Sequence, residues 1–189
     1  MKKYILVSIC FILITSFNFA ENKEISFFFF DDNIKNFYEK YFKIHGIEHT
    51  VDGAYIKINY DINLIKNILQ IEKLRMEIIR NNIANALTTR TTNGEFYYRQ
   101  YIDLNSEGEV IIKEDKDSNP RIVYDPLHPD SIKEEKLNGY VLYPNIYLPN
   151  ECYDLIIAIQ FYNGIVDYIQ RNNIGIVIEK IMERSIESK

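Results

Sequence analysis

The chain has 189 residues, of which 47% are hydrophobic and 14% aromatic, and its formal net charge is -5. This apolar content is well above that of disordered chains and is enough for one modest core. The 22 Lys and Arg residues are scattered among 27 acidic ones, so the sequence offers no basic face and argues against a nucleic-acid partner.

The first twenty residues differ from the rest of the chain. Two lysines precede an uncharged, mostly apolar run at residues 4–17, and Ala20 is followed by polar residues. This pattern is typical of a secretory signal peptide over residues 1–20. A membrane anchor is the alternative, but the run is shorter than the roughly 20 apolar residues that a membrane span needs. We therefore expect export, cleavage after Ala20 and no stable membrane span in the mature protein.

Residues 21–60 are expected to form a short α/β extension. Apolar residues recur at helical spacing from Asp31 to His45, which predicts a helix capped by Asp31 or Asp32. The four phenylalanines at 27–30 indicate a buried strand, and the alternation at 54–60 predicts a second strand or hairpin arm.

A long helix is predicted from residue 61 to about residue 87, and a Thr-rich stretch completes this segment at residue 94. Apolar residues recur along it every seven positions, at Ile62, Leu69, Met76 and Ile83. A second series follows three residues behind and is interrupted by one charge, at Ile65, Glu72, Ile79 and Ala86. Such stripes predict a partner helix or a supercoil seam.

The middle region, residues 95–149, is expected to be rich in strands and loops. Strands are predicted at 96–104, 109–113 and 121–124, with a hairpin turn at 105–108. Pro126 and Pro129 each remove a backbone donor and favour an extended predecessor, so residues 125–130 are predicted to form a fixed loop. His128 is expected to fix this loop through a hydrogen bond.

The last segment, residues 150–189, is predicted to be a second long helix that begins with Asn150 as N-cap and ends near residue 186. Its apolar residues also recur every seven positions, at Leu155, Tyr162 and Ile169 and at Ile159 and Val166. Cys152, the one cysteine of the mature chain, is expected to be a small buried side chain. The expected fold class is α+β, with the two long helices packed as a coiled-coil-like pair around the β-rich middle.

Two groups of motifs resemble one protein family. The first group is Lys-Leu-Arg-Met at 73–76, Asn-Asn-Ile-Ala-Asn-Ala at 81–86, Thr-Thr-Arg-Thr at 88–91 and Tyr-Arg-Gln at 98–100. The second group is a loop motif made of Asp125, Pro126, His128, Pro129, Asp130, Gly139, Tyr140, Pro144 and Asn145. Together they resemble the FlgC type of flagellar basal-body rod protein, over roughly residues 64 to 185.

The resemblance implies a structural subunit of the proximal rod in the periplasm, without enzymatic activity, cofactor, metal or small-molecule substrate. Its partners would be other rod subunits and further copies of itself, because contacts that do not close into a ring generate helical assemblies. The residues expected at the assembly interface are Leu69, Met76, Asn81, Asn82, Ile83, Asn85, Leu155, Ile159, Tyr162, Val166 and Ile169. The three asparagines suit a helix interior only where their amides meet partners.

Two alternatives stay open at this stage. Proteins of the resembled type begin almost directly with the first long helix, whereas this chain places a signal peptide and residues 21–60 ahead of it. It could therefore be a rod subunit with an added extension, or a periplasmic accessory or binding protein derived from the rod fold. A zinc-peptidase pattern, His-x-x-Glu-His at 45–49, is a weaker third reading, because Gly46 interrupts the helix that such a site needs.

Overall fold

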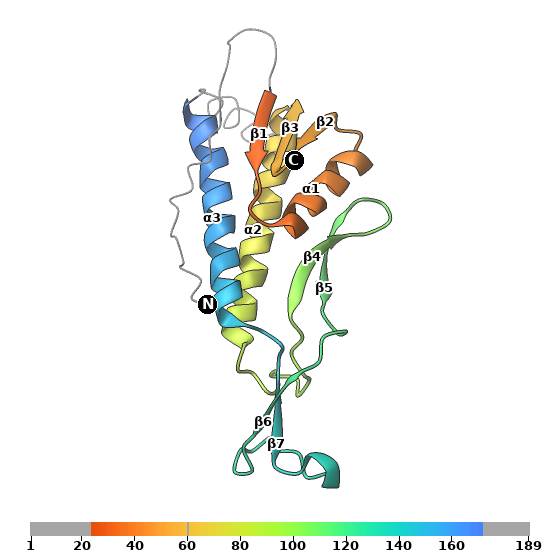
Figure 1. Cartoon of the computed structure of the whole chain (residues 1–189), viewed down its shortest axis with the longest axis vertical. Helices are drawn as coiled ribbons and strands as arrows, with labels where there is room; N and C mark the ends of the chain where they lie inside the picture. Colours follow the sequence, from red (N-terminus) through yellow and green to blue (C-terminus); the bar gives the residue numbers. More distant parts are fainter. Residues whose placement is uncertain (1–23, 60, 172–189) are drawn as a thin grey trace, which may run out of the picture. The chain divides into compact units, whose positions relative to one another are not determined.

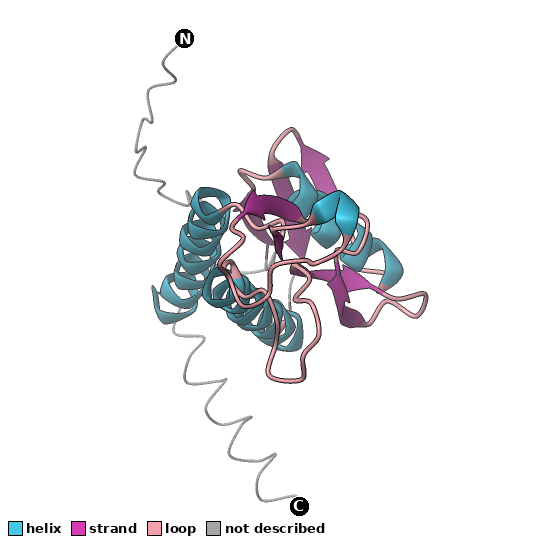
Figure 2. Ribbon diagram, turned by 90° about the horizontal axis from the view of Figure 1, so that it is seen from below, coloured by secondary structure: helices cyan, strands magenta, loops and turns pink. Residues whose placement is uncertain are grey.

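The computed structural model describes residues 24–59 and 61–171. The chain divides into two compact units, the first made of residues up to Leu69 together with those from Gln160 onward, and the second of residues 70–159. In the described residues the strands form small antiparallel sheets beside helices (Figures 1 and 2). The predicted α+β class is confirmed.

The extension folds as one strand, one helix and a hairpin: β1 (Glu24–Phe28), α1 (Asp32–Ile44), β2 (His49–Asp52) and β3 (Tyr55–Asn59). The sheet has the order β1-β3-β2, and all its pairs are antiparallel. Asp31 caps α1 as predicted, since its carboxylate accepts a hydrogen bond from the Asn33 N–H at 2.7 Å. The predicted helix and hairpin arm of the extension are therefore confirmed.

Strand alternation decides which of the four phenylalanines are buried. Phe27 lies opposite Ile56 in the sheet and is buried with it, and Phe29 is buried just beyond the strand end. Phe28 is half-buried, and Phe30 is exposed. Because successive side chains of a strand point to opposite faces, the predicted buried strand is correct for Phe27 and Phe29 and wrong for Phe30.

Two long helices, α2 (Ile62–Asn85) and α3 (Leu148–Arg171), each contribute residues to both units. Asp61 begins α2, and its Oδ1 accepts a hydrogen bond from the Leu64 N–H at 2.8 Å. The predicted start of α3 at Asn150 is wrong, because the helix begins two residues earlier at Leu148. Pro149 fits this first turn, where a missing N–H costs no helical hydrogen bond. The predicted continuation to residue 186 lies outside the described residues.

The middle region contains two strand pairs and a short 3-10 helix, η1 (Glu135–Leu137). The pairs are β4 (Gln100–Leu104) with β5 (Val110–Glu114), and β6 (Arg121–Tyr124) with β7 (Tyr140–Tyr143). The Asn105 side chain closes the predicted hairpin turn, because its Oδ1 accepts from the N–H groups of Glu107 and Glu109. The first predicted strand is four residues shorter than expected, because β4 begins at Gln100.

The proposed signal peptide at residues 1–20 lies outside the described residues. Within residues 24–59 and 61–171, no helix combines the length and the apolar content that crossing a membrane requires.

Candidate assembly interface

The apolar series that Glu72 interrupts faces the interior of the protein. Ile65, Ile79 and Ala86 are buried, and Glu72, the residue that interrupts this series, is fully buried as well. Glu72 forms an ion pair with the buried Arg75, whose Nη1 lies 3.2 Å from the Glu72 Oε2. A buried carboxylate needs such a partner. The uninterrupted series, Ile62, Leu69, Met76 and Ile83, is only half-buried.

Asn82 is buried and bonds through every donor and acceptor of its side-chain amide. Its Oδ1 accepts hydrogen bonds from the Gln100 N–H at 2.9 Å and from the Tyr97 hydroxyl at 3.0 Å. Its Nδ2 donates to the Gln100 carbonyl oxygen at 2.8 Å and to Glu151 Oε2 at 3.1 Å. An amide side chain has two donors and an acceptor oxygen with two lone pairs, so its capacity is used completely. The partners that a helix-interior asparagine needs are therefore supplied within the chain.

Glu151 is the charged member of this network. It is buried in the first turn of α3, and its Oε1 lies 2.5 Å from Arg99 Nε. Burial raises the pKa of the Tyr97 phenol, and the negative charge of Glu151 raises it further. Tyr97 therefore remains a hydrogen-bond donor at neutral pH. We name Asn82, Tyr97, Arg99, Gln100 and Glu151 the amide network, because it joins α2, β4 and α3 within the second unit.

The other two asparagines of the motif have different surroundings. Asn85 donates to the carbonyl oxygen of Asn81 at 2.9 Å and accepts from the Thr88 hydroxyl at 3.1 Å, so it closes the end of α2. The Asn81 side chain is exposed. Adjacent asparagines in one motif thus have distinct structural roles.

The loop motif is tied to the Thr-rich stretch that follows α2. The Thr89 hydroxyl donates to Asp130 Oδ2 at 2.6 Å, and Arg90 Nε lies 2.8 Å from Asp130 Oδ1. His128 Nδ1 accepts a hydrogen bond from the Asp130 N–H at 3.0 Å. The predicted role of His128 in fixing the loop is confirmed, and the two motif groups of the sequence meet at Asp130.

Gly139 closes the other side of this loop. Its φ is +81°, its carbonyl oxygen accepts from the Asp125 N–H at 2.9 Å, and its N–H donates to the Ile132 carbonyl oxygen at 2.9 Å. A Cβ at this position would lie 2.7 Å from the Tyr124 ring. The Tyr124 ring also packs edge-on against Tyr140, with ring centroids 5.1 Å apart. Both the backbone conformation and the lack of space therefore require glycine.

The remaining loop-motif residues differ in exposure. Pro144 is buried, and its carbonyl oxygen accepts from the Ile146 N–H at 2.8 Å. Pro126, Pro129 and Asn145 are exposed. The loop motif is thus fixed from within and presents several side chains to solvent.

Helix α3 carries two apolar faces. One face is buried and includes Ala158, Phe161, Ile165 and Tyr168. The second face, which we name the α3 stripe, advances by alternating steps of four and three residues and consists of Leu148, Cys152, Leu155, Ile159, Tyr162, Val166 and Ile169. The stripe residues directly follow those of the buried face in the sequence, so the two faces are about 100° apart around the helix.

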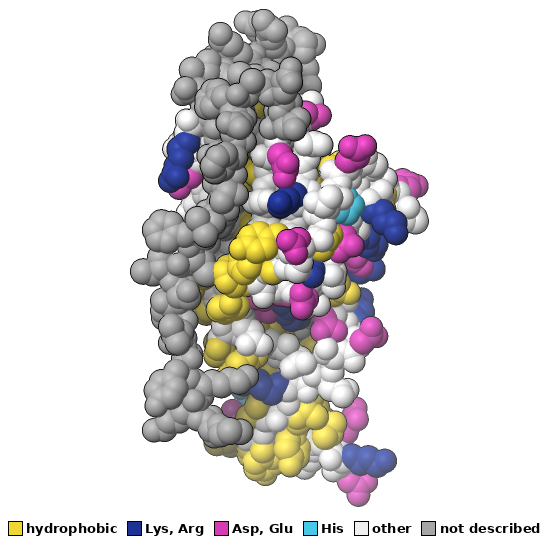
Figure 3. All heavy atoms as spheres, turned by 45° about the horizontal axis from the view of Figure 1, so that its top comes forward, with side chains coloured by type: hydrophobic (Ala, Val, Ile, Leu, Met, Phe, Trp, Pro, Cys, Tyr) yellow, Lys and Arg dark blue, Asp and Glu magenta, His cyan; other side chains and the backbone are white. Residues whose placement is uncertain are grey.

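The α3 stripe is largely accessible. Leu148, Cys152 and Ile159 are exposed, three further members are half-buried, and Ile169 is buried. The neighbouring Ile156 is 53% exposed. The predicted burial of Cys152 is wrong, because this residue belongs to the stripe and not to the inward face. Apolar side chains also lie in patches among charged ones on the face drawn in Figure 3.

Comparison with known proteins found similarity to flagellar rod proteins. No family model matches the chain. It is 35% identical over 125 residues to the flagellar basal-body rod protein FlgC of Borreliella burgdorferi, covering 82% of that protein and 54% of this chain. FlgC of Bacillus subtilis is 31% identical over 131 residues, with 84% of its length and 56% of this chain covered. FlgC of Borrelia hermsii is 46% identical over 41 residues, covering 70% of that protein and 22% of this chain.

The chain belongs to the FlgC family of flagellar basal-body rod proteins. Within this family member, the amide network and the loop motif are the places where motif residues meet in space. Glu151 was not predicted as a partner of Asn82. In the sequence, only the Tyr-Arg-Gln motif, which contains Arg99 and Gln100, pointed to a specific role for this region.

The zinc pattern does not form in this FlgC family member. His45 ends α1, whereas His49 lies in β2 and its Nδ1 hydrogen-bonds the Ile47 carbonyl oxygen at 2.9 Å. The pattern needs both histidines on one helix face. Across residues 24–59 and 61–171, no cluster of three or more His, Cys, Asp or Glu side chains could hold a metal ion.

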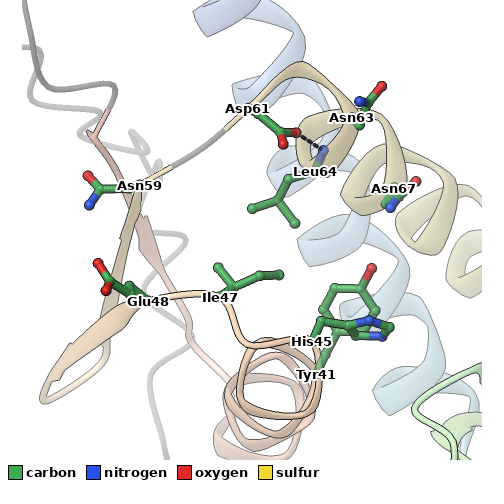
Figure 4. Close-up of a pocket in the computed structure, with 9 residues that line it drawn as sticks. All are labelled: Tyr41, His45, Ile47, Glu48, Asn59, Asp61, Asn63, Leu64 and Asn67. Carbon is green, nitrogen blue, oxygen red and sulfur yellow. Dashed lines mark hydrogen bonds between the residues drawn. The ribbon is translucent and has the colours of Figure 1, made fainter.

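His45 and Glu48 instead line an open surface pocket of about 380 Å³ in the first unit. Figure 4 shows Tyr41 and His45 at the end of α1, and Asn63 and Asn67 on the facing turns of α2. Burial raises the pKa of the Tyr41 phenol, which also hydrogen-bonds Asn67. Most of the polar side chains that line the pocket are exposed, so it provides no desolvated acid, base or nucleophile.

Replacing Asn82 should destabilise the second unit far more than replacing its neighbour. Asn82→Ala removes one hydrogen-bond partner from Glu151, one from the Tyr97 hydroxyl and two from the Gln100 backbone, and we expect a loss of about 3 kcal/mol in unfolding free energy. Asn81→Ala, at an exposed position of the same helix, should change it by less than about 0.5 kcal/mol. Urea denaturation measures both. Equal effects of the two substitutions would contradict the assignment.

Comparing two glycines with the same φ distinguishes the cost of backbone strain from the cost of a steric clash. Gly94 and Gly139 both have φ of +81°, but a Cβ at Gly94 meets nothing within 4 Å. Gly94→Ala should cost about 1 kcal/mol from the left-handed backbone alone. Gly139→Ala should cost at least about 1 kcal/mol more, because the added methyl group collides with Tyr124. Thermal denaturation of both variants tests this, and an equal cost would show that Tyr124 moves freely.

Proposed function

We propose that this chain is a structural subunit of the flagellar basal-body rod that assembles, through stripes on α2 and α3, with other rod subunits and with further copies of itself. The observation that carries the proposal is the exposed α3 stripe in a chain of the FlgC family. An apolar helix face of this length seldom remains in contact with water in a monomeric protein.

The spacing of the α3 stripe suits packing against another helix. Steps of four and three residues keep side chains on one seam, so that they can insert between the side chains of a partner helix. The half-buried series on α2, which includes Leu69, Met76 and Ile83, has the same seven-residue period. Stripes of equal period on two helices of one chain support a coiled-coil-like arrangement in the assembled rod.

The asparagines divide between folding and assembly in this proposal. Asn82 and Asn85 use their amides within the chain, and they shape α2 and the surface that it presents. Asn81 is exposed on the same helix and is proposed to bond a neighbouring subunit. The loop motif adds a second contact surface, since Leu127 is 93% exposed on a loop fixed by Asp130.

The proposed location is the proximal rod, in the periplasmic region of the cell envelope. Residues 1–20 are proposed to be a signal peptide that is removed after Ala20, and residues 21–60 to be an extension of the rod fold. We propose no catalytic role, because the family consists of rod proteins and the chain needs no chemistry to fulfil this function.

Charges placed on the α3 stripe at Ile159 and beside it at Ile156 should prevent assembly without unfolding the subunit. The double substitution Ile156→Glu and Ile159→Glu acts at positions that are 53% and 41% exposed, so the unfolding free energy should change by less than about 1 kcal/mol. Incorporation into purified basal bodies should fall at least tenfold, because two carboxylates would be buried in the contact. Immunoblotting of basal bodies measures incorporation.

The matched control is Asn93→Glu with Asn119→Glu, which adds two charges at exposed polar positions outside α3 and should be incorporated normally. Normal incorporation of the double variant would contradict the proposed interface.

A further inference from the structure

The extension in front of α2 covers part of α3. Its elements β1, α1, β2 and β3, which we name the N-terminal module, precede the region in which the sequence resembles rod proteins. The buried side chains of the module include Phe27, Phe29 and Tyr38. All three of these rings face one side chain from α3, Phe161, in the same unit.

The distances show close aromatic packing. The Phe161 ring centroid lies 5.3 Å from that of Phe27, 5.3 Å from that of Phe29 and 5.8 Å from that of Tyr38. Phe161 itself is 6% exposed. Aromatic pairs at these separations contribute beyond the area that they bury. Phe161 therefore completes the core of the module.

The module is too small to complete that core alone. It spans residues 24–59, and chains below about 40 residues seldom fold without a disulfide, a metal or a partner surface. Its inner sheet face consists of Ile25, Phe27, Ile56 and Ile58, which are all essentially inaccessible to solvent. The surface that it needs is an apolar face of the long helices.

Without the module, the Phe161 ring would be accessible on an apolar face of α3. Phe161, Ile165 and Tyr168 follow each other at steps of four and three residues and are buried in the first unit. Such an apolar face is suited to a helix of another subunit. The module thus occupies, within the chain, a surface of the type that the proposed function assigns to contacts between subunits.

We infer that the N-terminal module is an intramolecular substitute for a neighbouring copy of this chain at the Phe161 face of α3. This inference rests on the proposed function. While the module is docked, a second copy has no access to Phe161, and assembly is limited to the α3 stripe. When the module is displaced, the Phe161 face accepts an apolar helix face of a second copy.

The test uses a background that already carries one charge on the α3 stripe, at Ile159, and one beside it, at Ile156. In the mature full-length chain with Ile156→Glu and Ile159→Glu, the pair Phe27→Ser and Phe29→Ser removes two of the three rings on Phe161. Sedimentation velocity should then show concentration-dependent association, with an apparent dissociation constant at least tenfold lower than in the background alone. Adding Phe161→Ser should return the protein to a monomer.

The opposite face of the same strand supplies the matched control. Phe28→Ser with Phe30→Ser makes the same change in composition, but Phe28 is half-buried and Phe30 exposed. This control should remain monomeric in the same background. A monomeric Phe27/Phe29 variant with an unchanged helical circular dichroism signal would overturn the inference.

If the Phe27/Phe29 variant loses its helical circular dichroism signal, its association state no longer tests the inference. Hydrogen exchange on the unsubstituted chain then provides the test. The inference requires the module to open separately, so amides of β1 and β3 should exchange at least tenfold faster than those of α2 between residues 71 and 82. Equal exchange rates would overturn it, because the module could then leave only by global unfolding. Neither result alters the basal-body incorporation that tests the proposed function.

Discussion

The structure of the second unit depends on one buried amide. Asn82 uses all its hydrogen-bonding groups, and its partners come from the segment at Tyr97 and Gln100 and from the first turn of α3 at Glu151. A buried polar group left without partners is costly, whereas a fully bonded one fixes a single arrangement. Arg99 neutralises Glu151, so the carboxylate can accept the Asn82 amide without remaining an isolated buried charge. This network sets how the chain leaves α2 and how it enters α3 within the unit.

In the region after α2, the loop motif likewise uses bonded polar groups to fix a single arrangement of the chain. Asp130 is held by Thr89 and Arg90, and His128 holds the Asp130 backbone. Gly139 then allows the chain to pass Tyr124 with too little space for any side chain. A loop that is fixed from several directions loses little entropy when it contacts a partner. That property suits a subunit whose function is to hold neighbours in a fixed geometry.

The sequence predicted the elements well and their orientations less well. Periodicity located α1, α2 and α3, because a 3.6-residue repeat is a local property of the chain. It could not decide which of two apolar stripes on α2 faces inward, since Glu72 looks like a defect until Arg75 is seen beside it. Cys152 was expected in the core because free cysteines are usually buried, whereas it lies on an exposed apolar stripe, and such a stripe gives no sign of whether its partner lies in the same chain or in another. The amide network depends on contacts between residues far apart in the sequence, such as Asn82 with Glu151, and only the motifs pointed to it.

We propose that the exposed apolar side chains on α3 are one half of a contact that forms in the assembled rod. Mass spectrometry of purified basal bodies tests most directly whether this chain is a component of that rod. We predict that peptides from α2 and α3 are present in a constant ratio to those of the other rod proteins. Their absence from basal bodies, with the intact protein recovered free in the periplasm, would contradict it.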